Sequence, residues 1–290
     1  MEPASRERIR FGTSSFSSKD WVGPFYPDGT VPGEFLRHYA SEFDIVEVDS
    51  TYYAIPAAST VDGWLDKTPD HFLVSAKFPR AIVHGGDSSR PDANVLLSGD
   101  AALRSCDRFL QVIGRLGPKL GPLLIQFPYF NRSVFPAVGP FVERLAGFLE
   151  QLPTDFRYSV EIRNKAWLNE DFAALCRENN VALTLVDQGW MPMPDELEQK
   201  FDPVTTDFAY VRLLGDRKEI EAITKNWGQE VIDRGQKLER WAGILTGLSD
   251  RDIPTLVYVN NHYAGHAPET VRRLQEMFRK ASANGGSTQD

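Results

Sequence analysis

Two kinds of hydrophobic pattern alternate along the chain. Short segments rich in β-branched and aromatic residues, bounded by turn formers, predict strands. They lie at 9–15, 44–53, 72–79, 121–128, 157–163, 181–187, 208–215 and 254–261. Longer segments with apolar residues at helical spacing predict helices between the strands. These lie at 32–43, 59–68, 99–116, 135–152, 169–180, 238–250 and 267–281. The alternation indicates an α/β protein.

The order of these elements is strand then helix, repeated around eight strands, which is the pattern of a (β/α)8 barrel. A doubly wound open sheet is the competing fold, but no predicted strand is followed by Gly-x-Gly-x-x-Gly and no linker-like segment divides the chain. We therefore predict a single TIM-barrel domain over residues 1–282 and a flexible tail at 283–290. Residues 188–206 are proline-rich and aperiodic, so we expect a loop there that covers part of the site.

Composition narrows the class of protein further. The 290 residues are 42% hydrophobic and 25% charged, as in ordinary globular proteins. The formal net charge of −8 is unlike that of a dedicated nucleic-acid binder, although it leaves room for a local basic cleft. No apolar run is long enough to span a bilayer and no leader precedes the first strand, so we expect a cytoplasmic protein. Cys106 and Cys176 belong to no Cys-x-x-Cys pair and are expected to be buried free thiols.

Charged residues interrupt one of the predicted buried strands. Glu161 and Arg163 alternate there with Val160 and Ile162, which predicts that the charged pair shares one face and the apolar pair the other. Other predicted strands also end in polar residues: Glu47, Asp49, Lys77, Gln126, Asp187, Arg212 and Asn260. The carboxyl ends of barrel strands carry the active site. We therefore predict that these residues meet at the barrel mouth; the alternative is an ion-pair network that serves only stability.

Aromatic residues follow several of the same strands. Trp21, Tyr52 and Trp167 stand near polar strand ends, where rings could stack on a sugar or a nucleobase. For any one of these rings, packing of the loops is the simpler interpretation. Together with the polar residues, they complete the candidate binding site.

The sequence contains little evidence for a metal site or for a catalytic nucleophile. No zinc-ligand spacing of histidine or cysteine is present, so we predict no metal and no cofactor, with an oxygen-ligated divalent ion at the strand-end acids as a weaker alternative. Lys77 could be a Schiff-base nucleophile if it were desolvated. Carboxylates at neighbouring strand ends are expected instead to keep it charged, which favours an electrostatic clamp.

Seven sequence blocks resemble the signature blocks of one family. They lie in order at 12–27, 46–56, 75–85, 121–128, 160–168, 208–215 and 257–271. On these blocks the chain resembles the domain of unknown function 72 family, also called YecE-like. The resemblance implies a TIM barrel and no assigned activity; its outline is similar to the xylose-isomerase and endonuclease IV group, which is an analogy of fold alone. Histidines frequent in the family are replaced here by Asn164 and Leu214, so no role for them carries over.

Three functions fit these observations. The leading hypothesis is an enzyme, a hydrolase or an isomerase, that binds a small anionic or sugar-containing molecule. Arg163, Arg212 and Lys77 would hold the anion, Glu161 would be the general acid or base with Glu47 as the second carboxylate, and Asn260 and Gln126 would orient hydroxyls. An endonuclease IV-like phosphodiesterase that takes a nucleotide into the mouth is the second hypothesis. A non-catalytic binding barrel is the third. The sequence leaves the substrate and the oligomeric state open.

Overall fold

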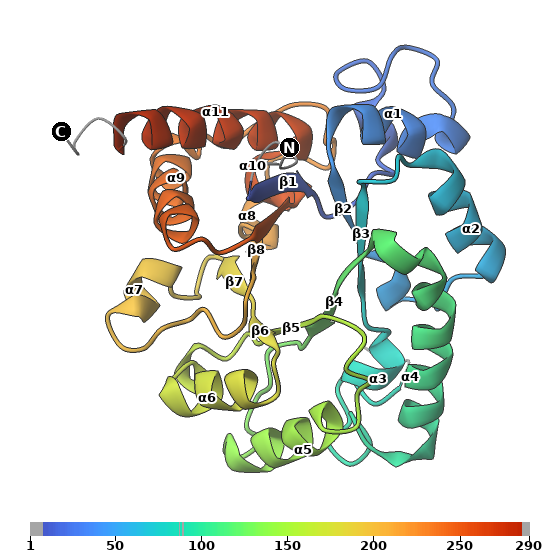
Figure 1. Cartoon of the computed structure of the whole chain (residues 1–290), viewed down its shortest axis with the longest axis vertical. Helices are drawn as coiled ribbons and strands as arrows, with labels where there is room; N and C mark the ends of the chain where they lie inside the picture. Colours follow the sequence, from blue (N-terminus) through green and yellow to red (C-terminus); the bar gives the residue numbers. More distant parts are fainter. Residues whose placement is uncertain (1–7, 87, 89, 286–290) are drawn as a thin grey trace, which may run out of the picture.

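Nine parallel strands form the core of the protein (Figure 1). The computed structural model describes residues 8–86, 88 and 90–285. Its strands are β1 (Ile9–Thr13), β2 (Ile45–Val48), β3 (Leu73–Lys77), β4 (Leu120–Gln126), β5 (Tyr158–Glu161), β6 (Ala182–Leu183), β7 (Leu185–Asp187), β8 (Ala209–Leu213) and β9 (Thr255–Val259). All eight predicted strands are present, with ends that differ by a few residues.

The extra strand comes from a break in the predicted segment 181–187. β6 pairs with β5. β7, which is separated from β6 by a single residue, pairs with β8 instead. β1 pairs with both β2 and β9, so the order of the sheet runs around a ring. The two short strands act as one interrupted sixth strand, and the predicted TIM barrel is confirmed.

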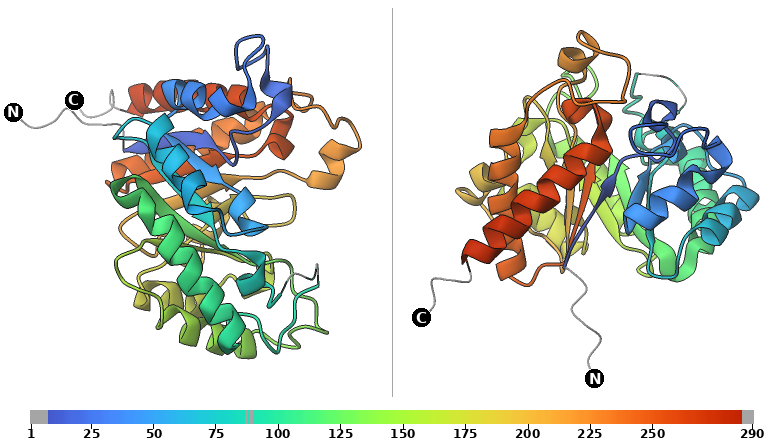
Figure 2. Two further views of the ribbon diagram at one scale, coloured as in Figure 1. Left: turned by 90° about the vertical axis from the view of Figure 1, so that its right-hand side faces the viewer. Right: turned by 90° about the horizontal axis from the view of Figure 1, so that it is seen from above.

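Helices surround the strands on the outside (Figure 1). They are α1 (Phe35–Glu42), α2 (Ala58–Lys67), α3 (Arg80–Val83), α4 (Gly99–Ile113), α5 (Gly139–Leu149), α6 (Glu170–Glu178), α7 (Pro194–Glu198), α8 (Arg217–Glu221), α9 (Gly235–Asp250), α10 (Asn261–Ala264) and α11 (Ala267–Gly285). Figure 2 shows α9 and α11 on one flank of the barrel and α1, α2 and α4 on the opposite flank. The predicted tail at 283–290 begins within α11, and residues 286–290 lie outside the described residues.

The segment 188–206 contains only the short helix α7 among otherwise irregular backbone, as predicted. It reaches over the end of β5, because the indole Nε1 of Trp190 donates a hydrogen bond to the carbonyl oxygen of Arg163 at 3.2 Å. The loop therefore borders the carboxyl ends of the strands.

Two apolar layers hold the barrel together. Outward-facing side chains such as Val46 and Val160 pack under the helices, while an inner cluster that includes Ile45, Tyr210 and Tyr258 fills the barrel interior. The Tyr210 and Tyr258 rings lie 4.9 Å apart and close the interior below the polar strand ends. Such a plug makes the barrel a packed core rather than a pore and gives the mouth a rigid floor.

Remaining predictions about the chain concern thiols and membranes. Cys106 and Cys176 are both buried and free, as expected. Burial raises the pKa of each thiol to about 12, so both are poor nucleophiles. Among the residues that the structure describes, no helix is both long and apolar enough to cross a membrane.

Candidate active site

Arg212 lies at the centre of a buried polar network at the barrel mouth. From β8 its guanidinium donates to Glu47 on β2 at 2.8 Å, to Gln126 on β4 at 3.2 Å, and to Glu161 on β5. The second oxygen of Glu47 accepts a hydrogen bond from the Tyr210 hydroxyl at 2.8 Å. Four strands that are far apart in sequence are thus joined through a single cation.

Burial and charge together fix the state of this network. The side chains of Arg212, Glu47 and Glu161 are 2%, 0% and 1% exposed. Burial alone would raise the pKa of Glu161, but the guanidinium groups of Arg212 and Arg163 outweigh it and hold that pKa below its ordinary value. Burial alone would lower the pKa of Arg212, but the charges of Glu161 and Glu47 outweigh it and raise that pKa above its ordinary value. Glu161 and Arg212 are therefore both charged at neutral pH and paired with each other.

A cavity of about 280 Å³ lies directly above the network. Four cationic side chains and one carboxylate are among the groups that line it: Lys77, Arg163, Arg212, Arg217 and Asp49. The other lining residues are Tyr52, Tyr53, Gln126, Gln188, Leu214, Gly215, Asn260 and His262. Because Glu47 and Glu161 lie beneath the lining, the surface that meets a ligand is biased towards positive charge.

Several buried polar atoms around this cavity have no partner among the described residues. They are Oε1 of Gln188, Nε of Arg212 and Nδ1 of His84, whose other ring nitrogen contacts the Tyr52 hydroxyl at 2.8 Å. A buried donor or acceptor left without a hydrogen bond costs about 1–3 kcal/mol. Gln188 and Arg212 line the cavity, and His84 contacts Tyr52, which also lines it. These unpartnered polar groups favour a site that is completed by a polar ligand or by water.

Lys77 and Asp49 have opposite and unusual protonation tendencies. Burial, with a further contribution from the charge of Arg212, lowers the pKa of Lys77 to about 8. Burial raises the pKa of Asp49, and the nearby charge of Lys77 only partly opposes this shift. The sequence-based expectation was that neighbouring carboxylates would keep Lys77 firmly charged. Most of the Lys77 amines are still charged at pH 7, but Glu47 and Glu161 are bound by Arg212, so burial outweighs them and the pKa of Lys77 lies below that of an ordinary lysine.

A second, smaller cavity of about 230 Å³ adjoins the first and shares Asp49, Asn260 and His262 with it. It lies against the serine-rich loop after β1, where the buried Oγ of Ser14 has no partner among the described residues. Trp21 closes one side and donates from Nε1 to the Asn261 side chain at 3.2 Å. The two cavities together form an elongated site with hydroxyl and amide groups at one end and cations at the other.

Most of the predicted site residues converge as expected. Those that line one or both cavities are Asp49, Tyr52, Lys77, Gln126, Arg163, Arg212, Asn260 and Trp21. Glu47 and Glu161 lie just below, in the network with Arg212. The ring of Trp21 is also held by edge-on packing against Phe25, at 5.6 Å between ring centres.

Asp187 and Trp167 lie elsewhere, which corrects their predicted position at the mouth. The Asp187 carboxylate accepts hydrogen bonds from Lys237 at 2.9 Å, Trp241 at 3.1 Å and Tyr263 at 2.8 Å, so it ties β7 to α9 and α10. Trp167 stacks on Phe141 at 5.1 Å between ring centres and packs a loop.

The reason for the error at Asp187 is strand alternation. Asp187 has the parity of Leu183 and Leu185, which belong to the outer core, so its side chain faces the helices. Gln188 has the inward parity and lines the cavity instead. Sequence reasoning missed Gln188, although the alternation of the preceding strand contained the signal. It also missed the hydroxyl of Tyr210, which lies deeper in the barrel.

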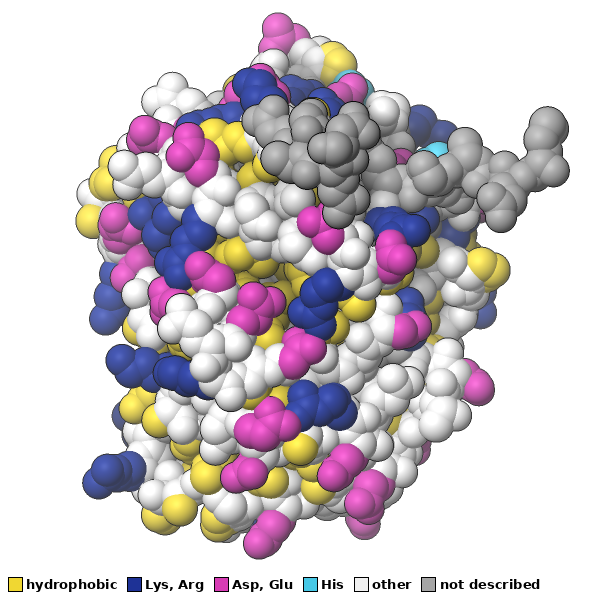
Figure 3. Space-filling model, turned by 60° about the vertical axis from the view of Figure 1, so that its left-hand side comes forward, with side chains coloured by type: hydrophobic (Ala, Val, Ile, Leu, Met, Phe, Trp, Pro, Cys, Tyr) yellow, Lys and Arg dark blue, Asp and Glu magenta, His cyan; other side chains and the backbone are white. Residues whose placement is uncertain are grey.

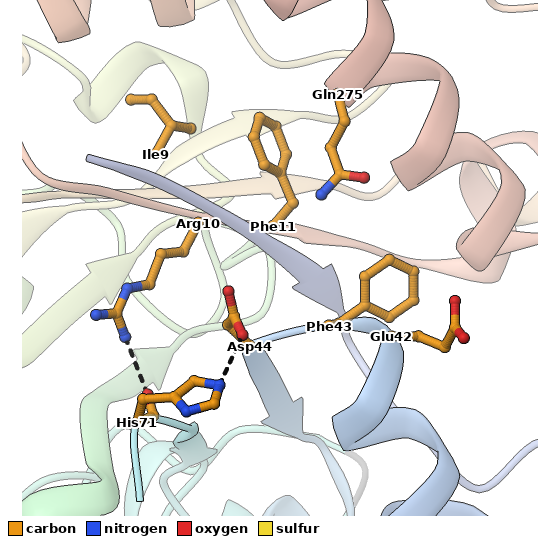
Figure 4. Close-up of a pocket in the computed structure, with 8 residues that line it drawn as sticks. All are labelled: Ile9, Arg10, Phe11, Glu42, Phe43, Asp44, His71 and Gln275. Carbon is orange, nitrogen blue, oxygen red and sulfur yellow. Dashed lines mark hydrogen bonds and ion pairs between the residues drawn. The ribbon is translucent and has the colours of Figure 1, made fainter. Parts of the chain in front are cut away.

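Another cavity, of about 430 Å³, lies at the amino-terminal ends of β1, β2 and β3 (Figure 4). Three of its polar side chains bind one another or the backbone. Arg10 donates to the carbonyl oxygen of His71 at 3.3 Å, and the His71 ring contacts Asp44 at 3.0 Å. Enzymes with this fold carry their sites at the other end of the barrel, so we assign no function to this cavity.

The described part of the chain holds no group of three or more histidine, cysteine, aspartate or glutamate residues placed to bind a metal ion. At the mouth, Glu47 and Glu161 are engaged by Arg212, which leaves Asp49 as the carboxylate that meets the cavity. The pairing of Glu47 and Glu161 with Arg212 disfavours the divalent-ion alternative, which needs free carboxylate oxygens.

Comparison with known proteins places this geometry in a family. The model of a protein family of unknown function, DUF72, matches residues 10–289. The chain belongs to the DUF72 family. A solved DUF72 structure from Thermotoga maritima is 28% identical, covers 94% of this chain and 98% of its own, and superposes with a TM-score of 0.70.

Two bacterial relatives have curated names but no named activity. UPF0759 protein YunF of Bacillus subtilis (strain 168) is 26% identical over 93% of this chain and 94% of its own length. UPF0759 protein YecE of Escherichia coli (strain K12) is 34% identical over 134 residues, which are 44% of this chain and 41% of YecE. The chain thus matches less than half the length of YecE, and DUF72 membership brings the fold without a reaction.

Proposed function

We propose that the barrel mouth binds a small anionic, hydroxylated molecule, such as a sugar phosphate or sugar acid, and acts on it as an enzyme. The observation that carries this proposal is the cavity lined by four cations and one carboxylate, with unpartnered buried polar atoms around it. A ligand that is anionic at one end and polar along its length would match both features.

Arg163 is the best placed group to hold the anion. Its Nε donates to Glu161 at 3.1 Å, and its terminal nitrogens have no hydrogen-bond partner among the described residues. The side chain is 25% exposed and lines the cavity, so the ion pair with Glu161 orients the guanidinium and leaves its terminal nitrogens free to bind a ligand. Arg212, by contrast, is committed to two carboxylates. A planar guanidinium with two free terminal nitrogens suits bidentate binding of a phosphate or carboxylate.

Amide side chains supply groups for hydroxyls. The side-chain oxygen of Asn260 accepts a hydrogen bond from the backbone of His262 at 2.9 Å, which leaves its NH2 group for a ligand. Gln188 lines the same cavity and carries an acceptor oxygen that has no partner among the described residues. A donor and an acceptor on one wall are the complement that a hydroxylated carbon chain requires.

The arrangement favours isomerisation over hydrolysis by paired carboxylates. Glycoside hydrolysis commonly uses two carboxyl groups that both reach the substrate. Here Glu47 and Glu161 are buried and paired with Arg212, whereas Asp49 meets the cavity with a raised pKa. A single tuned carboxyl group beside a cation is suited to moving a proton next to a carbonyl group. We assign the acid–base role to Asp49, and a supporting electrostatic role to Glu161 and Glu47.

A nucleic-acid ligand receives less support. The net charge is −8, and on the face drawn in Figure 3 basic and acidic side chains are interspersed rather than gathered in a basic patch. Arg240 on α9 and Arg251, which directly follows α9, are both paired with acids of the segment that contains α7. Phosphodiester binding relies on unpaired cations along a groove.

Binding measurements on matched ligands test the proposal. We would titrate a panel of sugar phosphates and sugar acids, each with its neutral parent sugar, into wild type, Arg163→Met and Arg115→Met by calorimetry. Arg115 is the matched control, because it forms an exposed pair with Asp62 away from the site. We expect anionic members to bind wild type and Arg115→Met, and Arg163→Met to bind them at least about tenfold more weakly. Equal binding of the neutral parents, or no effect of Arg163→Met, would overturn the proposal.

A further inference from the structure

Lys77 brings a primary amine to the cavity with no acidic partner. Its Nζ lies 5.0 Å from the centre of the Tyr52 ring, and it has neither an ion pair nor a hydrogen bond with the residues that the structure describes. Glu47 on β2 and Glu161 on β5, whose charges act on Lys77, are bound by Arg212 instead. A lysine that served the fold alone would be expected to pair with one of them, since an unpaired buried charge is costly.

The surroundings also favour the reactive form of this amine. With a pKa of about 8, roughly a tenth of the Lys77 amines are neutral at pH 7, far more than for an ordinary lysine. The Asp49 carboxyl, whose pKa is raised, lines the same cavity. A nucleophilic amine and a nearby proton donor are the two groups that condensation with a carbonyl compound requires.

We propose that Lys77 forms an imine with the aldehyde or ketone carbon of an anionic, hydroxylated substrate held in this cavity. The inference rests on the proposed function and narrows its substrate class to carbonyl compounds. Arg163 holds the anionic end, while the carbonyl carbon lies over Lys77. An imine withdraws electrons from the adjacent carbon, so that carbon can lose a proton, as isomerisation requires.

The step balances without an oxidant or a reductant. The lone pair of neutral Nζ attacks the carbonyl carbon, and the proton released from nitrogen moves to the oxygen to give a carbinolamine. The Asp49 carboxyl group, which has taken up the proton that the Lys77 ammonium group lost on becoming neutral, then gives that proton to the hydroxyl group, which leaves as water while the carbon–nitrogen double bond forms. The products are an iminium ion, one water molecule and the Asp49 carboxylate, which can next accept the proton from the adjacent carbon.

Reductive trapping tests the imine directly. Wild-type protein would be incubated at pH 7 with glyceraldehyde 3-phosphate and cyanoborohydride, and adducts would be mapped by peptide mass spectrometry. Lys237 is the internal comparison, because it is 44% exposed and paired with Asp187 outside the cavity. We expect at least about tenfold more adduct on Lys77 than on Lys237, the reverse of what accessibility alone would give. Comparable labelling of the two lysines would overturn the inference.

Two variants and one further probe separate this inference from the proposed function. Lys77→Arg keeps the charge and removes the nucleophile, so its trapping should be lost, while Lys237→Arg should leave trapping at Lys77 intact. If Lys77→Arg does not fold, the mapping of wild type still decides. Binding of glyceraldehyde 3-phosphate that depends on Arg163, without an adduct on Lys77, would overturn the imine and leave the proposed function standing. An adduct on Lys77 that forms as fast with unphosphorylated glyceraldehyde would support the imine and overturn the anion-binding function.

Discussion

Replacing Arg212 by methionine should damage the protein far more than replacing Arg163 in the same way. Both arginines bind Glu161, but Arg212 also binds Glu47 and is 2% exposed, whereas Arg163 is 25% exposed. Removing one partner of a buried ion pair costs about 3–5 kcal/mol, because the other charge is left without compensation. Arg212→Met leaves Glu47 with the Tyr210 hydroxyl alone and Glu161 with Arg163 alone, so we expect a loss near 5 kcal/mol.

Arg163→Met leaves Glu161 bound to Arg212. The ion pair that is lost is partly exposed and therefore already weakened by solvent screening, so the loss of unfolding free energy should be about 1 kcal/mol. The sequence places Arg163 beside Glu161, and the structure adds Arg212 as the second cation that remains when Arg163 is lost. The difference between the variants, about 4 kcal/mol, is a large part of the stability of a typical domain.

Urea unfolding at pH 7 and pH 5 measures both variants. In Arg212→Met, the buried carboxylates of Glu47 and Glu161 have lost this cation, so they bind protons more readily in the folded chain than in the unfolded chain. The loss of unfolding free energy should therefore shrink as the pH falls. Adding Glu47→Gln and Glu161→Gln should recover much of the lost stability, because neutral amides need no cation. Equal losses for the two arginine variants, or a deficit that does not depend on pH, would refute the network as described.

Two further predictions concern the fold. Gly12→Ala should cost at least about 2 kcal/mol of unfolding free energy, because a Cβ there would lie 2.0 Å from the Ile45 carbonyl oxygen. In the control Gly63→Ala on α2, the new Cβ meets nothing within 4 Å, so that variant should be neutral or more stable than wild type. Similar urea midpoints for the two variants would contradict this prediction. Burial, helped by Arg80, lowers the pKa of His84 from 6.5 to about 4. Neutral His84 therefore contributes stability that is complete above pH 6.5 and is lost as the pH falls towards 4, by up to about 3 kcal/mol. A His84→Asn variant should lack that part of the loss in urea titrations, and an unchanged pH profile would rule the contribution out.

Strand alternation explains what the sequence could predict. The inward parity of Glu47, Glu161 and Arg212 follows from the apolar residues between them, and the barrel then brings the three together. The same rule, applied to the break between β6 and β7, would have put Gln188 at the mouth and Asp187 outside it.

Strand alternation cannot predict which charged side chains pair with one another across the barrel. The state of Lys77 depends on which cation binds the carboxylates, and Arg212, which does so, lies 135 residues further along the chain (212 minus 77). No local pattern distinguishes Arg163, which keeps donors for a ligand, from Arg212, which does not. That distinction arises from depth in the barrel, and it decides which residues can act on a substrate.

The most direct test of the central claim is to identify what the mouth carries. Small molecules released by denaturing natively purified protein would be analysed by mass spectrometry for wild type, Arg163→Met and the control Arg115→Met. The account predicts anionic, hydroxylated compounds with a carbonyl group in wild type and in Arg115→Met, and their loss from Arg163→Met. The same compounds at the same occupancy in Arg163→Met, or short oligonucleotides from wild type, would contradict it.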